Sequence, residues 1–567
     1  MSVRVWAPLV DRLAVEVDGE VLPMTPAPGG WWSGPVVADG ARYGFLLGDD
    51  PVPKPDPRGR RLPDGVHGLS EATPPRIAEV GDWAGRALTD GVIYELHVGT
   101  FTAEGTLDAA IARLGHLVDL GVAFVELLPV NAFNGTWNWG YDGVAWFAVQ
   151  ESYGGPDAYA RFVAACHERG LGVIQDVVYN HLGPSGNYLP LFGPYLREEG
   201  ANTWGAEVNL DEPEVRRYIL DNARMWFEEY GVDGLRLDAV HALRDTSGEH
   251  ILAALARETH QLSRRLGRPL TLIAESDLND PVMFRPRSAG GHGLTAQWSD
   301  DYHHAVHVAL TGETTGYYAD FAPLSALGTV ATRGFFHAGT WSSFREREHG
   351  VPLDDDTEAW RLVTFSQDHD QIGNRATGDR LTASLSPRRL AIAAVLTVLS
   401  PSTPMLFMGE EWGASTPWQF FTSHPEPDLG RATAEGRIAE FSRHGWDPAV
   451  VPDPQDPETF QRSKLDWREL DAEPHATLLA RYRELIALRR REPDLRSPRL
   501  GDLRAEVDEA SRRVALERGG LRILINLGET DWAPGLAGEL LFATSEDVAA
   551  DPLTLPPDSA AVVRMPG

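Results

Sequence analysis

The sequence has very little cysteine and no long apolar run. Its single cysteine, Cys166, excludes a disulfide within the chain and argues against a disulfide-stabilised secreted scaffold. No stretch approaches the roughly 18 uncharged apolar residues that a membrane-spanning helix requires. The first residues, "MSVRVWAPLVDRLAVEV", lack a basic region followed by an apolar run, so we expect no signal peptide. A cytoplasmic protein that does not contact membranes is therefore expected.

Positive charge is also scarce. Lysine and arginine number 51 against 82 aspartate and glutamate residues, which gives a formal net charge of −31. Such a surface repels phosphate backbones, so nucleic acid is not expected as a partner. A neutral substrate would be indifferent to this charge.

What the chain does contain is a globular composition, with 43% hydrophobic residues and 17 tryptophans among 567 residues. This length is too great for one hydrophobic core, so several domains are expected. The segment "LAVEVDGEVLPM" alternates in polarity around Asp18-Gly19, which predicts a β-hairpin. We predict an N-terminal β-sandwich over residues 1–88, a large central domain over 89–494 and a small β domain over 495–567.

The middle segment alternates between short β-rich runs and amphipathic helical stretches. Two of the helical stretches, residues 107–121 and 156–170, end in glycine, which is typical of a helix C-terminus. This α/β alternation predicts a (β/α)₈ barrel, also called a TIM barrel. The eight predicted strands are residues 92–98, 124–130, 172–178, 234–240, 271–276, 294–299, 361–367 and 403–409.

Polar residues gather where these predicted strands end. Catalytic groups of such barrels lie at the C-terminal ends of the strands, so these side chains are expected to converge on one rim. They are Asp176, Asn180 and His181 after the third strand, Arg236, Asp238 and His241 at the fourth, Glu275 at the fifth, Asp368, His369 and Asp370 at the seventh, and Glu410 and Glu411 at the eighth.

Arg236 and Asp238 lie two residues apart, so their side chains point to the same side of the strand. A neighbouring cation favours an ionised carboxylate, as a nucleophile requires. Glu275 follows the apolar run Leu272-Ile273-Ala274, and apolar surroundings favour the protonated form that suits a general acid. Two carboxyl groups in unlike environments predict a glycosidase, and a separation of about 5–5.5 Å would make it a retaining one.

The segments "DVVYNH", "GLRLDAV", "AES" and "DHDQIGN" resemble, in order and spacing, four short regions of the α-amylase superfamily, glycoside hydrolase family 13. The resemblance implies that Asp238 is the nucleophile, Glu275 the general acid/base and Asp370 the stabiliser of the transition state. It also implies that Arg236, His181 and His369 support the site, and that Tyr141 in "NWGYDGV" stacks on a sugar. Asp142, His241 and Trp204 complete the candidate substrate contacts.

Within that superfamily, "LPVNAFNGTWNWGYDGVAWFAV", "GANTWGAEVNLD" and "FMGEEWGASTPWQFFTSH" most resemble the trehalohydrolases that act on maltooligosyl trehalose. The resemblance implies hydrolysis of the α-1,4 bond next to the terminal trehalose, with retention and without a cofactor. It also implies a functional link to a synthase that makes this substrate. Aromatic side chains would stack on the sugars, and we expect about half of these to line the cleft: Trp137, Trp139, Tyr141, Tyr188, Phe192, Trp204, Trp412, Trp418, Phe420 and Phe421.

Two other hypotheses stay open on the residues alone. One is glycogen branching or debranching on the same barrel, and the other is a non-enzymatic α-glucan-binding protein. The intact Asp238, Glu275 and Asp370 argue against the second.

Two smaller features also have alternative interpretations. His303 and His307 have helical metal-ligand spacing but lack an acidic partner at zincin spacing, so we expect no metal site there. Trp31-Trp32 could bind sugar, although such a pair more often packs against a neighbouring domain.

Overall fold

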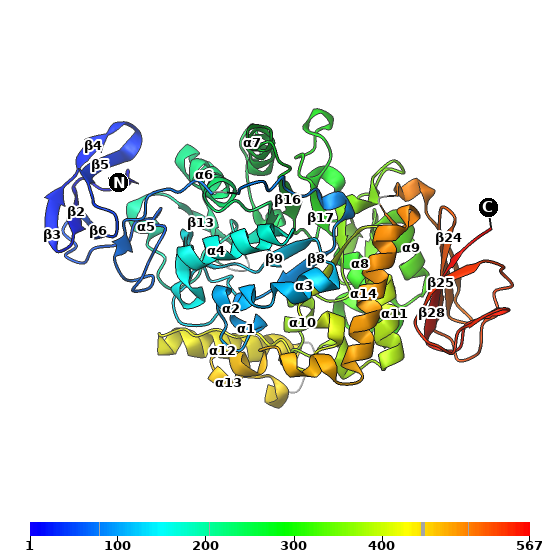
Figure 1. Cartoon of the computed structure of the whole chain (residues 1–567). Coiled ribbons are helices and arrows are strands. Elements are labelled where there is room, and N and C mark those ends of the chain that lie inside the picture. The colour runs from blue at the N-terminus through cyan, green and yellow to red at the C-terminus, as the bar shows by residue number, and fades with distance from the viewer. Residues whose placement is uncertain (79, 203–204, 444–447, 497, 567) are drawn as a thin grey trace.

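Eight parallel strands close into a barrel at the centre of the chain (Figure 1). The computed structural model describes all residues except 79, 203–204, 444–447, 497 and 567. Each predicted strand is confirmed, but most end several residues early, because the residues that follow leave the ladder to build the rim. The barrel strands, in spatial order, are β8 (Ile93–Leu96), β9 (Phe124–Leu127), β12 (Gly172–Val177), β15 (Gly234–Leu237), β16 (Thr271–Ala274), β17 (Ala296–Trp298), β20 (Leu362–Thr364) and β21 (Thr403–Phe407).

The barrel interior is layered, because every second residue of a strand points inward. The lower layer is apolar and packs as one buried cluster: Ile93, Phe124, Ile174, Ile273, Ala296, Val363 and Met405. Two residues further along, four neighbouring strands instead place Glu95, Glu126, Asp176 and Arg236 in the buried interior. The apolar layer thus forms a floor, and a charged layer lies directly above it.

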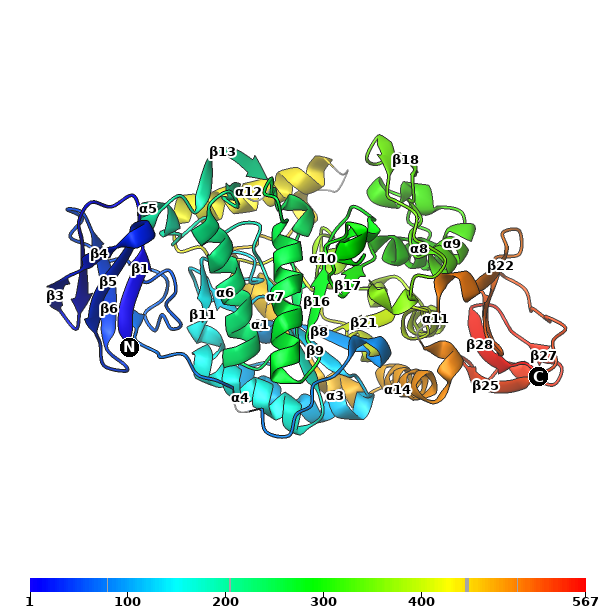
Figure 2. The same cartoon turned by 90° about the horizontal axis from the view of Figure 1, so that it is seen from above.

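Helices cover the outside of the barrel, as Figure 2 shows for α4, α6 and α7. The predicted helix 107–121 is in fact two helices, because the chain tightens into a turn at Ala112 and Arg113. The longer helices are α4 (Gly155–Glu168), α6 (Pro213–Glu229), α7 (Ile251–Leu266), α8 (Asp300–Thr311), α9 (Ser325–Arg333), α11 (Pro387–Val398), α12 (Pro427–Arg443) and α14 (His475–Arg491); the shorter ones are α1 (Val98–Phe101), α2 (Leu107–Ile111), α3 (Leu114–Leu120), α5 (Leu189–Phe192), α10 (His369–Gly373) and α13 (Pro457–Arg462).

Two β domains flank the barrel at opposite ends, the N-terminal one in blue and the C-terminal one in red (Figures 1 and 2). The N-terminal domain has two sheets: β1 (Ser2–Trp6), β5 (Trp31–Val36) and β4 (Thr25–Ala27), and β3 (Glu20–Pro23), β2 (Leu13–Val17), β6 (Arg42–Leu47) and β7 (Ser70–Glu71). The C-terminal sheet has the order β22 (Arg504–Asp508), β23 (Arg513–Arg518), β24 (Leu521–Asn526), β28 (Ser559–Arg564) and β25 (Glu539–Ala543), beside the short pair β26 (Ala549–Ala550) and β27 (Leu553–Thr554).

Both flanking domains pack firmly on the barrel. The Trp6 ring lies 5.1 Å from that of Tyr195, and at the other end Arg389 donates to Asp558 at 2.9 Å. The Trp31-Trp32 pair also makes protein contacts: Trp32 is buried and donates to the carbonyl of Ala7, while Arg4 lies 5.1 Å from the Trp31 ring. Packing therefore accounts for this pair, and sugar binding by it stays untested.

Three two-stranded ribbons rise from the loops at the C-terminal ends of the barrel strands: β10 (Asn131–Ala132) with β11 (Ala145–Val149), β13 (Leu196–Asn202) with β14 (Gly205–Val208), and β18 (Thr340–Ser342) with β19 (Arg347–His349). The first ribbon carries the loop that holds Tyr141. Among the described residues, no helix combines the length and apolar character needed to cross a membrane.

Candidate active site

Arg236 is the centre of the polar cluster above the barrel floor. Its guanidinium is fully buried, and its Nη1 donates to Asp238 Oδ1 at 2.7 Å and to Asp176 Oδ2 at 2.9 Å. Its Nη2 lies 3.8 Å from Glu275 Oε2. The Trp298 ring covers the guanidinium at 4.4 Å, a distance that allows a cation–π interaction. One buried cation therefore contacts the carboxylates predicted to be nucleophile and general acid.

Asp238 and Glu275 follow the paired residues Leu237 and Ala274 on adjacent strands. Neighbouring strands lie about 4.7–4.9 Å apart, so the two carboxyl groups start from neighbouring backbone positions. Asn180 Nδ2 donates to Asp238 Oδ2 at 2.7 Å, so both oxygens of this carboxylate are held. The Ala239 amide donates to Glu275 Oε2 at 2.6 Å. The arrangement orients both groups toward the same rim.

Ala239 makes this contact from a strained backbone conformation. Its φ of 40° and ψ of 50° lie in the left-handed region, which is uncommon for a residue other than glycine. The strand ends here because this conformation turns the chain into the 3₁₀ helix Val240–Ala242. Such strain is often stored beside functional groups, and here it allows one peptide to link the two carboxylates.

A second group of contacts joins Tyr141, His369 and Asp370. The Tyr141 hydroxyl lies 2.7 Å from both Asp176 Oδ2 and His369 Nε2, and its ring stacks on the imidazole at 5.2 Å. His369 Nε2 is also 3.5 Å from Asp370 Oδ2. The Asp370 side chain is 44% exposed, against 12% for Asp238 and 16% for Glu275. Asp370 is thus the most open of the three carboxylates.

Burial and neighbouring charges set the proton affinities in this cluster. Burial raises the pKa of Glu275 above its ordinary value, although Arg236 acts in the opposite direction. Burial also raises the pKa of Asp176, to about 7, against the pull of Arg236. For His369, burial alone would lower the pKa, but Asp370 and Glu95 raise it to about 10. The site therefore combines an imidazolium, a guanidinium and a carboxyl group that holds its proton to higher pH than usual.

The other residues predicted to contact the substrate differ in how directly they join the cluster around Arg236. His181 Nδ1 is 2.5 Å from Asn180 Oδ1 and its Nε2 is 3.0 Å from the Tyr141 carbonyl, so it supports the cluster. His241 Nδ1 lies 3.7 Å from Asp277 Oδ1 at the partly open rim. Asp142 accepts from Asn138 at 2.5 Å and lies 3.9 Å from His424 Nε2, so its described contacts are away from Asp238 and Glu275. Trp204 lies outside the described residues.

Two of the acidic residues expected at the rim are instead structural. Glu410 is buried and accepts from Ser366 and from the Tyr482 hydroxyl of α14, at 2.9 and 2.8 Å. Glu411 is buried and lies 2.7 Å from His116 of α3. Gly409 turns the chain with a φ of 84°, which directs both side chains toward the covering helices. The prediction that they converge with the catalytic groups was wrong.

The aromatic candidates divide in a similar way. Five of the nine that the structure describes are buried and pack in the core: Trp139, Phe192, Trp412, Trp418 and Phe421. Four keep some exposed surface and remain candidates for contact with sugar: Trp137, Tyr141, Tyr188 and Phe420.

His303 and His307 both lie on α8, and each has a protein partner from the segment that follows this helix. His303 Nε2 lies 2.9 Å from the Tyr318 hydroxyl, and His307 Nε2 lies 2.9 Å from Glu313 Oε2. In the described part of the chain, no group of three or more His, Cys, Asp or Glu side chains is arranged to hold a metal ion.

Comparison with known proteins identifies the family. The family description "Alpha amylase, catalytic domain" matches residues 76–190, and "Domain of unknown function (DUF3459)" matches residues 498–562. A malto-oligosyltrehalose trehalohydrolase of Rhizobium sp. (strain M-11) is 58% identical over 580 residues, which cover 99% of this chain and 97% of that protein. One from Arthrobacter ramosus is 59% identical and covers 99% of both chains. The chain belongs to the malto-oligosyltrehalose trehalohydrolase family.

A solved structure shares the fold of the whole chain. The crystal structure of a Salmonella typhimurium protein, titled there as an alpha amylase, superposes with a TM-score of 0.91. It is 37% identical and covers all of this chain and 97% of its own. A 1,4-alpha-glucan branching enzyme of Xanthomonas campestris is 30% identical over only 53% of this chain. The similarity to branching enzymes is therefore weaker than that to trehalohydrolases and covers only part of the chain.

Sequence reasoning missed two acidic residues beside the candidate active site. Asp300 begins α8 two residues after strand β17, and burial together with Glu275 and Asp277 raises its pKa well above the ordinary value. Glu95 lies inside strand β8 and contacts His369. Asp300 stands just after the sixth predicted strand, so the rule that functional groups follow strand ends could have identified it. Glu95 stands in an apolar run. Because side chains alternate along a strand, its position two residues after Ile93 could have indicated that it points into the barrel.

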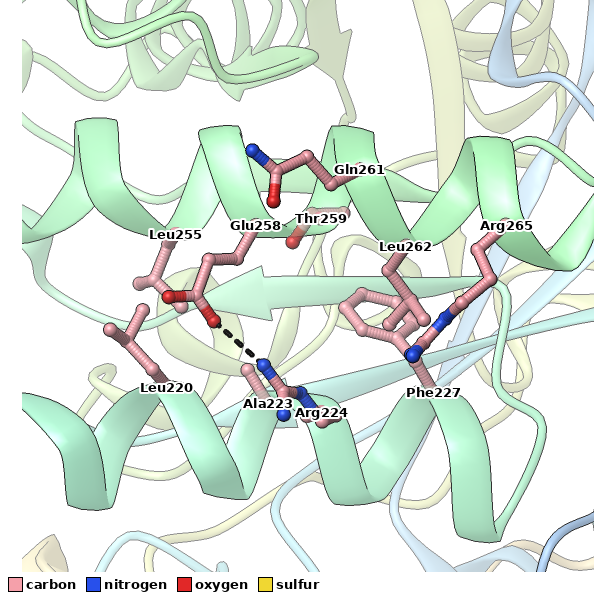
Figure 3. Close-up of a pocket in the computed structure, with 10 residues that line it drawn as sticks. All are labelled: Leu220, Ala223, Arg224, Phe227, Leu255, Glu258, Thr259, Gln261, Leu262 and Arg265. Carbon is pink, nitrogen blue, oxygen red and sulfur yellow. Dashed lines mark hydrogen bonds and ion pairs between the residues drawn. The ribbon is translucent and has the colours of Figure 1, made fainter.

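One further concave feature lies outside the candidate active site. A cavity of about 230 Å³ lies between α6 and α7. Figure 3 shows its lining side chains, which include the apolar Phe227 and Leu262. Arg224 donates to Glu258 across it at 3.2 Å. Its lining residues all belong to the two covering helices, and none of the predicted catalytic residues is among them.

Proposed function

We propose that this protein is a retaining glycoside hydrolase that acts on maltooligosyl trehalose. It cleaves the α-1,4 bond next to the terminal trehalose and releases trehalose and a maltooligosaccharide. The observation that carries the proposal is the 58% identity to a malto-oligosyltrehalose trehalohydrolase over nearly the whole of both chains. The buried Arg236 that joins Asp238 and Glu275 supports the same chemistry.

In the first step, the Asp238 carboxylate attacks the anomeric carbon while the Glu275 carboxyl donates its proton to the glycosidic oxygen. The carbon–oxygen bond breaks, and trehalose leaves with that proton. The raised pKa of Glu275 keeps the proton available at higher pH than for an ordinary glutamate. Arg236 and Asn180 fix the attacking carboxylate in position.

In the second step, the Glu275 carboxylate takes a proton from water, and the water oxygen attacks the same carbon. The ester to Asp238 breaks, and the configuration at carbon is restored by two inversions. Asp370, which is the most open carboxylate, faces the positive charge that develops on the sugar ring. Bonds and protons balance with water alone, so the proposal needs no cofactor.

Tyr141, His181, His369 and His241 serve in this proposal as contacts for the sugar that is attacked. Asp142 and Trp204 are kept as candidates for more distant subsites. We further propose a cytoplasmic enzyme coupled in function to a synthase that supplies maltooligosyl trehalose, since hydrolysis of this substrate requires a reaction that forms it.

The test offers the purified protein maltopentaose and maltotriosyl trehalose, which have equal length, and follows the products by chromatography. We expect fast release of free trehalose and slow attack on maltopentaose. Comparable cleavage of both would instead indicate a general amylase. New α-1,6 linkages on amylose without released trehalose would move the protein to the branching enzymes.

A further inference from the structure

Glu95 is a buried acid on the first barrel strand that the steps above do not use. Its side chain is only 1% exposed, and both of its oxygens contact a single neighbouring residue. Oε1 lies 2.5 Å from His369 Nδ1, and Oε2 accepts from the His369 backbone amide at 3.1 Å. One carboxylate therefore holds both the ring and the main chain of His369.

The other ring nitrogen of His369 faces the site. Nε2 lies 2.7 Å from the Tyr141 hydroxyl and 3.5 Å from Asp370 Oδ2. A hydrogen bond at one imidazole nitrogen fixes what the other nitrogen can do. Since Nδ1 donates to Glu95, the Nε2 proton of the imidazolium is directed toward Tyr141 and Asp370.

The surroundings of His369 are closed and strongly charged. The Tyr141 ring stacks on the imidazole with an interplanar angle of 17°, and the Trp139 ring meets it edge-on at 5.9 Å. The titratable and charged groups that act on the imidazole are Glu95, His97, Glu126, Tyr141, Asp176, Arg236, Asp368 and Asp370. Glu95 is the one among them that contacts Nδ1 in the described structure.

We propose that Glu95 is a positioning residue that aligns His369 with Tyr141 and Asp370 and supplies its buried counter-charge. Without this carboxylate, Nδ1 loses the charged acceptor that fixes the ring's orientation, and the donor at Nε2 is less firmly directed at the sugar site. The inference rests on the proposed hydrolase function for its kinetic assay, but not for its titration.

Glu126 offers a matched control. It is the direct partner of Glu95 in the parallel pairing of β8 and β9, and it is equally buried at 1% exposure. Burial, followed by Glu95 and Asp176, raises its pKa well above the ordinary value, which favours the neutral carboxyl. Glu126→Gln replaces this acid by a neutral group of the same size that does not touch Nδ1, whereas Glu95→Gln removes the carboxylate that contacts Nδ1.

The experiment compares the native protein with Glu95→Gln, Glu95→Asp and Glu126→Gln. Proteins labelled at histidine ¹³Cε1 are titrated by NMR, with the His369 signal assigned by its loss in His369→Gln. We expect the imidazole of the native protein to titrate with a pKa of about 10, since Asp370 and Glu95 overcome the effect of burial. We expect Glu95→Gln to lower that pKa by about one unit or more, and Glu126→Gln to leave it unchanged.

Kinetics with maltotriosyl trehalose complete the test. We expect Glu95→Gln to lower kcat by about 10- to 100-fold with little change in KM, by analogy with the loss of a carboxylate that holds a metal-binding histidine. Glu95→Asp keeps the charge, so it should retain the high pKa of His369 and have a higher kcat than Glu95→Gln. This variant also tests the proposal if Glu95→Gln folds poorly.

Unchanged His369 titration in Glu95→Gln would overturn the proposal, as would equal losses of activity in Glu95→Gln and Glu126→Gln. Failure of the native protein to release trehalose would instead refute the proposed function. The titration result would still stand in that case.

Discussion

At the scale of single residues, the site depends on charges held away from water. Arg236 is fully buried and has carboxylates on two sides, so its positive charge is compensated within the barrel. The same guanidinium holds Asp238 in place and approaches Glu275. The hydrogen bonds that stabilise the buried Arg236 are therefore the same ones that position the proposed nucleophile, Asp238.

Asp238→Asn and Glu275→Gln test the two assigned roles. Loss of the general acid should lower kcat by about 10²- to 10⁴-fold, and loss of the nucleophile by at least as much. Steady-state kinetics on maltotriosyl trehalose would measure this, with circular dichroism to verify the fold. Undiminished hydrolysis by both variants would show that the roles are assigned to the wrong residues.

Arg236→Ala should reduce both activity and stability. Removing one partner from a buried ion pair leaves Asp176 and Asp238 uncompensated, which typically costs about 3–5 kcal/mol. Arg236→Lys keeps the charge but loses the forked geometry, so it should retain more stability than activity. Urea unfolding beside kinetics separates the two effects. Equal losses of stability in both variants would contradict the role given to the charge.

At the scale of the element, strand β15 ends where its backbone turns into the left-handed region. The next strand, β16, ends in step with it, and the Ala239 amide then reaches the Glu275 carboxylate. The turn is therefore what places Asp238 and Glu275 on one rim. Its strain is located at a single residue.

Ala239→Gly should relieve that strain. The left-handed conformation costs about 1–2 kcal/mol for a residue with a Cβ, whereas the added freedom of glycine in the unfolded chain costs about 0.4–1 kcal/mol. We expect a stability unchanged or raised by up to about 1.5 kcal/mol. Ala274→Gly, at a buried extended position in β16, is the control and should destabilise by about 0.5–1 kcal/mol. Equal destabilisation by both changes would argue against strain at Ala239.

At the scale of the whole molecule, two β domains extend a strongly acidic barrel protein at both ends (Figure 1). The charge of −31 sits on a protein whose proposed substrate is neutral. Long-range electrostatic steering affects charged ligands and is screened by salt. The net charge should therefore have no part in substrate capture.

We accordingly expect KM for maltotriosyl trehalose to change less than about twofold between about 0.05 M and 0.5 M NaCl. Initial rates at several salt concentrations would measure this, with maltopentaose as a second neutral substrate. A steep dependence of KM on salt for either sugar would show that charge does contribute to binding.

The sequence by itself determined the barrel, its eight strands, the flanking β domains and the group of polar residues at the strand ends. These features follow from local periodicity and from alternation along a strand, both of which a chain displays without folding. Only the tertiary structure decided that Glu410 and Glu411 face α14 and α3, that five of the nine described aromatic candidates are core, and that Glu95 contacts His369. These outcomes depend on which side chains meet across elements far apart in the chain, and on backbone turns such as those at Gly409 and Ala239, which no local pattern fixes.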